Sequence, residues 1–226
     1  MSDKIVMAWS SGKDSAMALH ALRKDSRFEV AALLTTITTT YDRVSMHGVR
    51  HALLDRQAAA TGLPMEKVFI TPGASNDDYE KAMGQTLERL KAQGVTGVAF
   101  GDIFLEDLRR YREEKLAGAG MSGVFPLWKQ PTAELAGRFI ADGFKAVLTC
   151  VDSRVLDGRF CGRDFDQSLL ADLPAGVDPC GENGEFHSFC FAGPVFAAEI
   201  PIRKGQVVLR DERYWYCDVE AEDASH

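Results

Sequence analysis

The stretch MAWSSGKDSAMALHAL, residues 7–22, decides how the rest of the chain is interpreted. An apolar run ends at Trp9, a small polar segment follows, and a helical pattern of apolar residues begins after it. A turn from a strand into a helix presents unpaired N–H groups and the positive end of the helix dipole, which together favour an anion. Gly12 permits close approach of the backbone, and Lys13 adds a cation. The stretch therefore predicts a phosphate site between the first strand and the first helix.

Two common phosphate-binding motifs do not fit this loop. A Walker A loop needs a glycine five positions before Gly12 and a hydroxyl residue after Lys13, but those positions hold Met7 and Asp14. The dinucleotide-binding pattern GxGxxG is also missing. Asp14 stands where a Walker A loop has its magnesium-binding hydroxyl, so its carboxylate is our candidate for orienting the loop or holding Mg²⁺. A polar turn with an ordinary helix cap is the alternative interpretation of residues 10–15.

Short apolar runs alternate with amphipathic stretches through the first two thirds of the chain. This alternation predicts parallel strands joined by right-handed helical crossovers, and hence a doubly wound α/β sheet with helices on both faces. Buried strands are expected at residues 5–9, 30–34, 68–70, 95–100 and 146–151. Helices are expected at residues 15–24, 49–60 and 77–93, and from 132 to about 142.

The alternation of apolar and amphipathic segments ends after residue 151. Residues 152–190 are rich in Gly, Asp and Cys, with one short helix expected near 165–171. Residues 194–217 predict antiparallel strands, with a hairpin turn at Lys204–Gly205. We therefore expect an ATP-binding domain at residues 1–151 and a smaller α+β substrate-site region at residues 152–226, ending in antiparallel strands.

The composition is that of an ordinary globular protein and argues against two classes of partner. There are 26 basic and 33 acidic residues, a formal charge of −7, and no long basic run, so neither nucleic acid nor an anionic membrane is expected. The first residues lead directly into a short apolar strand, which favours a cytoplasmic protein over one with a signal peptide or membrane span. The five cysteines include no CxxC pair, which predicts reduced thiols.

Residues 10–15, SSGKDS, resemble the pyrophosphate-binding loop of the N-type ATP pyrophosphatases, usually written SGGKDS. Ser11 stands at the second position of this loop, where the pattern has glycine, and its side chain restricts the backbone there. Five further stretches match one branch of that superfamily, the diphthine-ammonia ligase family: MHGVR (46–50), FGDI (100–103), FPLW (125–128), GRDFD (162–166) and DPCGENGEFHSF (178–189). Together they span nearly the whole chain. The resemblance implies an adenine nucleotide α-hydrolase-like (HUP) fold. It also implies a ligase that uses ATP and Mg²⁺ to adenylate a carboxylate, transfers ammonia to it, and releases AMP and pyrophosphate.

Residue chemistry and this resemblance together give the candidate site. The segment CGENGEFHSF holds carboxylates and an imidazole suited to take a proton from ammonium, with Glu185 the first choice and His187 the second. Asp102 follows a strand at the edge where open α/β sheets bind ligands, and its alternative role is a strand-end cap. Arg109 and Arg112 share a helix face nearby and suit a carboxylate or phosphate. The expected nucleotide-binding residues are Ser10, Ser11, Gly12, Lys13, Asp14, Ser15, His47, Gly48, Gly101 and Asp102. The expected catalytic residues are Lys13, Glu182, Glu185 and His187, and the expected metal ligand is Asp14.

Two other functions stay open at this point. The same loop occurs in enzymes that transfer sulfur to tRNA, but these normally need catalytic cysteines and a basic surface. A sensor that binds ATP without turnover is the second alternative, and the dense loop around Glu185 and His187 favours catalysis over sensing. The carboxylate substrate implied by the family is diphthine on elongation factor two, which applies to archaea and eukaryotes. Assembly into a homo-oligomer is left open.

Overall fold

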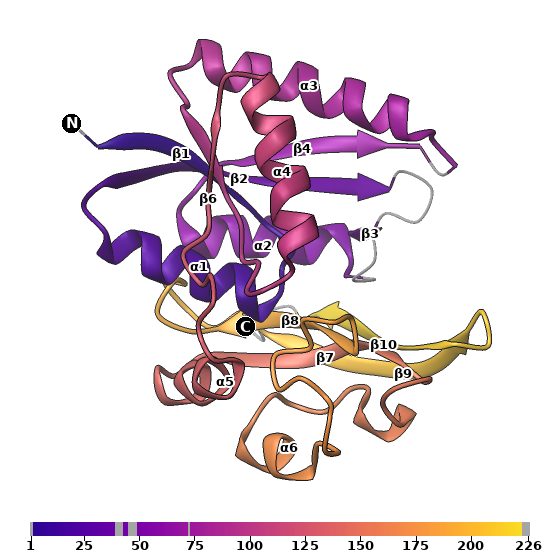
Figure 1. Ribbon diagram of the computed structural model, residues 1–226. Helices are drawn as coiled ribbons and strands as arrows, with labels where there is room; N and C mark the ends of the chain where they lie inside the picture. The colour runs from indigo at the N-terminus through magenta and orange to yellow at the C-terminus, as the bar shows by residue number, and fades with distance from the viewer. Residues whose placement is uncertain (1, 39–42, 45–48, 72, 223–226) are drawn as a thin grey trace.

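The computed structural model describes residues 2–38, 43–44, 49–71 and 73–222, and its first layer is a sheet in which five strands pair in parallel (Figure 1). These are β4 (Met65–Ile70), β2 (Phe28–Thr38), β1 (Asp3–Ala8), β5 (Gly97–Ala99) and β6 (Ser122–Val124), in that spatial order. The two-residue strand β3 (Arg43–Val44) pairs antiparallel with the end of β2. The sheet confirms the predicted doubly wound α/β fold.

The helices cover the two faces of this sheet in pairs. Helices α1 (Lys13–Lys24) and α2 (His51–Thr61) pack on one face, in a core that includes Ile5, Met7 and Leu33. Helices α3 (Asn76–Ala92) and α4 (Glu106–Gly118) pack on the other face, in a core that includes Val6 and Leu34. Alternate residues of β1 and β2 thus face opposite layers, as the side-chain period of a strand requires. This two-sided burial explains why the strands have continuous apolar runs in the sequence.

The strand order fixes where a ligand can bind. From β1 the chain passes to β2 and then β4 on one side, and it returns to β5 and β6 on the other side of β1. The carboxyl ends of β1 and β5 are therefore neighbours at the topological switch point, where open α/β sheets bind ligands. The loop at residues 10–15 follows β1, and Gly101 and Asp102 lie just beyond the end of β5.

A second sheet lies beside the first and is antiparallel. Its strands are β8 (Phe186–Ala192), β7 (Lys145–Asp152), β10 (Tyr214–Ala221) and β9 (Ile202–Arg210), in that spatial order. Helices α5 (Thr132–Ala141) and α6 (Gln167–Asp172) and the short 3₁₀ helix η1 (Gly158–Phe160) flank it (Figure 1). The smaller antiparallel C-terminal region is therefore confirmed.

Two expectations for this region were wrong. Residues 146–151 were expected in the parallel sheet but form part of β7, because a run buried on both faces has the same apolar pattern in either sheet. The hairpin turn was expected at Lys204–Gly205, but both residues lie inside β9 and the turn falls at Asp211 and Glu212, which have φ of 51° and 52°. Gly205 instead lies opposite a register shift in β10, where a Cβ would approach the backbone oxygen of Asp218 to 3.2 Å.

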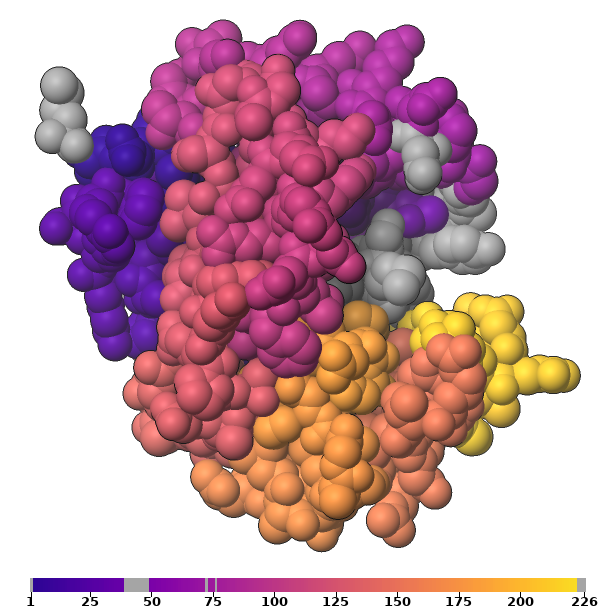
Figure 2. Space-filling model, viewed as in Figure 1, coloured from indigo at the N-terminus to yellow at the C-terminus, as the bar shows by residue number. Residues whose placement is uncertain are grey.

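The two sheets share one apolar core. Its members include Leu19 of α1 and Leu53 of α2 together with Val147 of β7 and Phe189 of β8. Figure 2 shows the amino-terminal part, from indigo to rose, packed against the orange and yellow carboxy-terminal part. The outer edge of β8 also hydrogen-bonds to the loop after β1, because the N–H of Cys190 donates to the carbonyl of Ser11 at 2.9 Å. No helix among the described residues is long and apolar enough to cross a membrane.

Candidate functional site

The loop after β1 turns sharply at Ser11. This residue has φ of 72°, in the left-handed region that favours glycine. A side chain in that conformation costs about 1–3 kcal/mol, so the surroundings must hold it in place. The Ser11 hydroxyl is fully buried and has no hydrogen-bond partner among the described residues. Position 11 thus has the backbone conformation that glycine adopts easily, which agrees with the glycine at this position in the SGGKDS pattern. Serine adopts the same conformation with strain.

Among the described residues, only neutral hydroxyl groups accept from the first amides at the start of α1. Gly12, the N-cap of α1, provides no side-chain cap. The hydroxyl of Ser15 donates back to the Gly12 carbonyl at 2.9 Å, and the Gly12 N–H donates to Ser10 Oγ at 3.3 Å. The N–H of Lys13 donates to Ser188 Oγ of β8 at 3.2 Å. Hydroxyl groups therefore surround the first amides of α1, where both the amides and the helix dipole favour phosphate.

The side chain of Lys13 is buried and links the loop to the second sheet. Its ammonium lies 2.6 Å and 2.8 Å from the two carboxylate oxygens of Asp14 and donates to the carbonyl of Cys180. It also lies over the rings of Phe165 and Phe186, at 5.6 Å and 5.8 Å from their centroids. Burial disfavours the charged form, but the negative groups around the ammonium, Asp14 first and then Cys180 and Glu182, together hold the pKa of Lys13 above its usual value. Lys13 therefore keeps a positive charge inside the site.

Gly101 and Asp102 meet this loop across the switch point. A Cβ at Gly101 would lie 2.9 Å from the carbonyl carbon of Asp14, so only glycine allows the end of β5 to pack against α1. Asp102 is 13% exposed and forms an ion pair with Arg112, with 2.7 Å between Oδ2 and Nε. Burial raises the pKa of Asp102, while Arg112 lowers it. The structure thus brings Arg112 into the site.

Arg109 lies on the same helix but belongs to a different set of contacts. Its guanidinium pairs with Glu113 at 2.8 Å and lies 4.6 Å from the ring centroids of both Phe125 and Trp128. Trp128 is half-buried, and its ring serves as a stacking surface for this cation.

The loop between α6 and β8 supplies the acidic side chains, and Glu182 reaches furthest toward the sheet. Its Oε1 accepts hydrogen bonds from the N–H groups of Ile103 at 2.7 Å and Phe104 at 3.4 Å, immediately after Asp102. Burial raises the pKa of Glu182 to about 7, with a further contribution from the charge of Asp14. A carboxylate with this pKa exchanges a proton near neutral pH.

Glu185 is committed to its own loop. It is 5% exposed and accepts from the N–H of Asp178, the N–H of Asn183 and the side-chain amide of Asn183, each at 3.0 Å. Both carboxylate oxygens are therefore used to close residues 178–185 into a compact turn. This turn places the carbonyl of Cys180 against Lys13 and the carboxylate of Glu182 against the segment after β5.

His187 lies at the start of β8. Burial, and then the charge of Lys13, lower its pKa to about 4. His187 is therefore neutral near pH 7 and can exchange hydrogen bonds without carrying a charge. The structure brings Lys13, Glu182 and His187 into one electrostatic neighbourhood, whereas His47 and Gly48 lie outside the described residues.

The carboxylates fit a magnesium ion only in company with a ligand. The described residues contain no group of three His, Cys, Asp or Glu side chains that would hold a metal. Asp14 and Asp102 lie close enough for the charge of Asp14 to raise the pKa of Asp102. Magnesium is commonly held by one or two carboxylates together with substrate phosphates, and these two residues fit that arrangement.

Sequence reasoning missed two residues of the site. Gln57 is fully buried on α2 and hydrogen-bonds to the loop, and Ser188 caps the first amide of α1. A polar residue among the apolar positions of a helix is the signal for Gln57, since Leu53, Leu54 and Gln57 follow helical spacing. Ser188 belongs to the segment CGENGEFHSF, but the sequence does not indicate its role as a cap, because its partner Lys13 lies 175 positions away.

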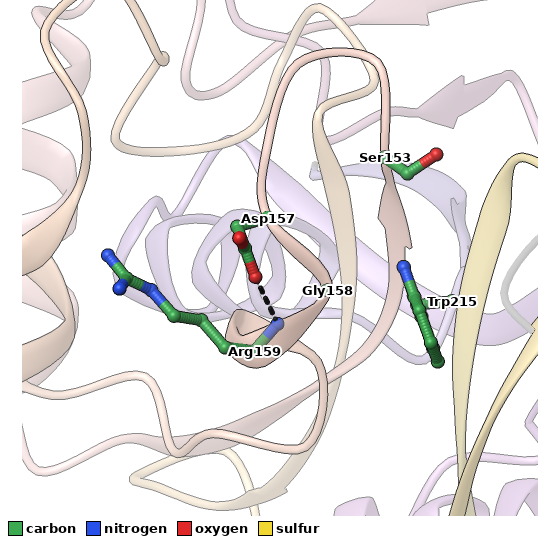
Figure 3. Close-up of a pocket in the computed structure, with 5 residues that line it drawn as sticks. All are labelled: Ser153, Asp157, Gly158, Arg159 and Trp215. Carbon is green, nitrogen blue, oxygen red and sulfur yellow. Dashed lines mark hydrogen bonds between the residues drawn. The ribbon is translucent and has the colours of Figure 1, made fainter.

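A separate hollow of about 450 Å³ involves none of these residues. It is lined by Ser153, Asp157, Gly158, Arg159 and Trp215. Figure 3 shows the Trp215 indole and the carboxylate of Asp157, which accepts a hydrogen bond from the Arg159 N–H at 2.8 Å. A side chain at position 158 would collide with the indole, so Gly158 serves this local packing.

Comparison with known proteins places nearly the whole chain in two family domains. Residues 3–122 match the diphthamide synthase N-terminal domain, and residues 132–223 match the diphthamide synthase C-terminal domain. A diphthine–ammonia ligase from Homo sapiens is 29% identical over 178 residues, covering 71% of this chain and 66% of the human protein. One from Danio rerio is 28% identical over 180 residues, covering 73% and 70%. One from Schizosaccharomyces pombe is 25% identical over 225 residues, covering 91% of this chain and 37% of that protein. The match to the human relative thus spans slightly less than two thirds of its length.

Proposed function

The chain belongs to the diphthamide synthase family, and from this we propose that it is an ATP-dependent ligase that joins ammonia to a carboxylate. One observation carries the proposal. The anion-binding start of α1 and the acidic turn at residues 178–185 form a single site, in which the Lys13 ammonium touches both Asp14 and the carbonyl of Cys180. A nucleotide bound at α1 therefore lies next to groups able to exchange protons.

In this proposal the loop at residues 10–15 binds the β- and γ-phosphates of ATP. On nucleotide binding, the amides of Gly12 and Lys13 would exchange their hydrogen bonds to Ser10 Oγ and Ser188 Oγ for bonds to phosphate oxygens. The hydroxyls of Ser10 and Ser15 would turn to donate to the same oxygens, and the Lys13 ammonium would balance their charge. Asp14 and Asp102 would hold Mg²⁺ together with the phosphates, where the ion would supply charge neutralisation for the departing pyrophosphate. The substrate carboxylate attacks the α-phosphorus, which releases pyrophosphate and leaves an acyl-adenylate.

Ammonia then displaces AMP from the acyl-adenylate. Ammonium has no free electron pair, so a base must first accept a proton from it. We assign this role to Glu182, since its pKa of about 7 suits proton transfer and it lies beside Asp102 at the switch point. Glu185 would support this role by holding the turn that presents Glu182, and His187 would act as a neutral hydrogen-bonding partner.

The buried cysteines disfavour sulfur transfer as an alternative. Burial raises the pKa of Cys150 to about 11 and the pKa values of Cys161 and Cys180 to about 12. It also raises the pKa of Cys190 and of Cys217. Thiols of this kind contain little of the thiolate that a sulfur carrier needs.

The test follows the nucleotide products. The protein is incubated with α-labelled ATP, magnesium, ammonium and a set of carboxylic acids. The set includes diphthine, which the names of the relatives suggest, presented on elongation factor two. We expect AMP and pyrophosphate in equal amounts, with one carboxylate converted to its amide. ADP as the main enzyme-dependent product would exclude the proposed chemistry, and tight binding without turnover would favour an ATP sensor.

A further inference from the structure

Gln57 lies on α2, outside the loop motif, yet its side chain contacts three separate segments. Its Oε1 accepts the indole N–H of Trp9 at 2.8 Å. Its Nε2 donates to the carbonyl of Ser11 at 3.0 Å and to the carbonyl of Cys190 at 2.7 Å. Both N–H groups and the oxygen of the amide are thus used inside the protein. Gln57 therefore joins the end of β1, the loop at residues 10–15 and β8 through one planar amide group.

The contact with Ser11 determines which way one peptide of the loop faces. The Ser11 carbonyl accepts from two donors, Gln57 Nε2 and the N–H of Cys190. The described residues contain no cis peptide bond, so the N–H of Gly12 points away from the Ser11 carbonyl. It donates to Ser10 Oγ at 3.3 Å, a hydroxyl that a phosphate oxygen would replace. A peptide turned the other way would direct its carbonyl oxygen, with its partial negative charge, to the side where Gly12 now presents its N–H.

Ser11 needs such an external constraint because of its own backbone. Its φ of 72° is rarely adopted by residues with a side chain, and such conformations persist where surrounding contacts fix them. Of the two donors on its carbonyl, Cys190 contributes a backbone group that any residue would supply. Gln57 contributes a side chain, and a glutamate of the same shape would place a carboxylate against two carbonyl oxygens.

We propose that Gln57 is a positioning residue for the nucleotide: it holds the Ser11–Gly12 peptide so that the Gly12 amide is directed toward the phosphates of ATP. This inference rests on the proposed binding of ATP at the loop. Gln57 touches no reacting atom, so its effect falls on nucleotide affinity.

The test measures binding of α,β-methylene-ATP, which resists cleavage between the α- and β-phosphates, by calorimetry. Gln57→Met removes both donors, and Gln57→Asn keeps the amide but shortens its reach. We expect both variants to bind at least tenfold more weakly than the natural protein. Leu54→Ala is the matched control, because it opens the same buried helix face without removing a polar contact to the loop. It is expected to lower the Tm and to leave the affinity of the folded protein unchanged.

A second substitution separates positioning from packing. Glycine adopts a positive φ freely, so adding Ser11→Gly to Gln57→Met is expected to restore at least fivefold of the lost affinity. Affinity within twofold of the natural protein in both Gln57 variants would overturn the inference, as would the absence of rescue by Ser11→Gly. If Gln57→Met does not fold, Gln57→Asn with and without Ser11→Gly gives the same comparison. Failure of the natural protein to bind the nucleotide would instead refute the proposed function.

Discussion

Replacing Lys13 by methionine is expected to weaken both the fold and ATP binding, for two different reasons. The side chain of Lys13 is 2% exposed and that of its partner Asp14 is 31% exposed. Removing one partner of a buried ion pair costs about 3–5 kcal/mol, and because water reaches part of Asp14 we expect about 2–3 kcal/mol here. In a protein of 226 residues this corresponds to a loss of roughly 4–12 °C in Tm.

The loss of stability depends on pH in a defined direction. Burial raises the pKa of Asp14 in the folded protein, and Lys13 opposes that rise. Without Lys13 the folded pKa rises further above the unfolded value, so ionisation of Asp14 opposes folding. The deficit of Lys13→Met relative to the natural protein is therefore largest near pH 7 and shrinks as the pH falls through the raised pKa toward 4. Thermal denaturation followed by circular dichroism between pH 4 and pH 8 measures this difference.

The double variant Lys13→Met with Asp14→Asn separates the two effects. Neutralising Asp14 removes the unpaired charge, so the double variant is expected to regain most of the lost stability at pH 7. Calorimetry is expected to find ATP binding still lost, because the cation that balances the phosphates is missing. A double variant as unstable as Lys13→Met would refute the assignment of the loss to Asp14. Natural ATP affinity in Lys13→Met would move the phosphate site elsewhere.

Three further substitutions or treatments test other parts of the site. Ser11→Gly is expected to stabilise the protein by about 1–2 kcal/mol. The substitution relieves the left-handed backbone and removes a buried hydroxyl that has no hydrogen-bond partner among the described residues, and these gains outweigh the entropy that a flexible glycine adds to the unfolded chain. A Tm below that of the natural protein would contradict this. Glu182→Gln is expected to keep ATP binding and lose amide formation. The pKa of Glu182 in the folded protein is raised to about 7, so ionisation of Glu182 destabilises the fold as the pH rises from about 4.5. In calorimetric scans the Tm of Glu182→Gln is therefore expected to exceed that of the natural protein at pH 8 and to equal it at pH 4. All five cysteines are buried, so Ellman's reagent at pH 8 is expected to label the native protein only slowly and to titrate five thiols after denaturation in guanidinium.

The parallel sheet and its helices were predictable from the sequence because elements that follow one another along the chain also pack against one another in the fold. Strand β1, the polar loop and α1 follow one another directly, and the period of apolar residues reports which face is buried. The sequence of an apolar strand does not indicate which other strand it pairs with. Residues 146–151 are apolar whether they join a parallel or an antiparallel sheet, and the sheet they join is set by contacts with β8 and β10, some 35 to 75 positions further along.

The acidic segment shows the same limit for the site. The residues CGENGEFHSF identify a group of acids and a histidine, but the sequence does not distinguish Glu182 from Glu185. Their difference arises from the amides within reach: Glu185 meets those of its own turn, whereas Glu182 meets the N–H of Ile103, 79 positions earlier. The raised pKa of Glu182 follows from that burial against the first sheet.

The hydrogen bond between Lys13 and Ser188 has a consequence for the protein during its own synthesis. The loop at residues 10–15 leaves the ribosome well before β8, because the hydroxyl that caps α1 lies 175 positions after Lys13 and the strand edge that holds Ser11 lies beside it. Chains are made at roughly 5–20 residues per second, so about 10–35 seconds pass before these partners are made. The nascent chain therefore carries the loop at residues 10–15 without its β8 contacts throughout that interval, and the loop reaches its native form only after β8 has been made.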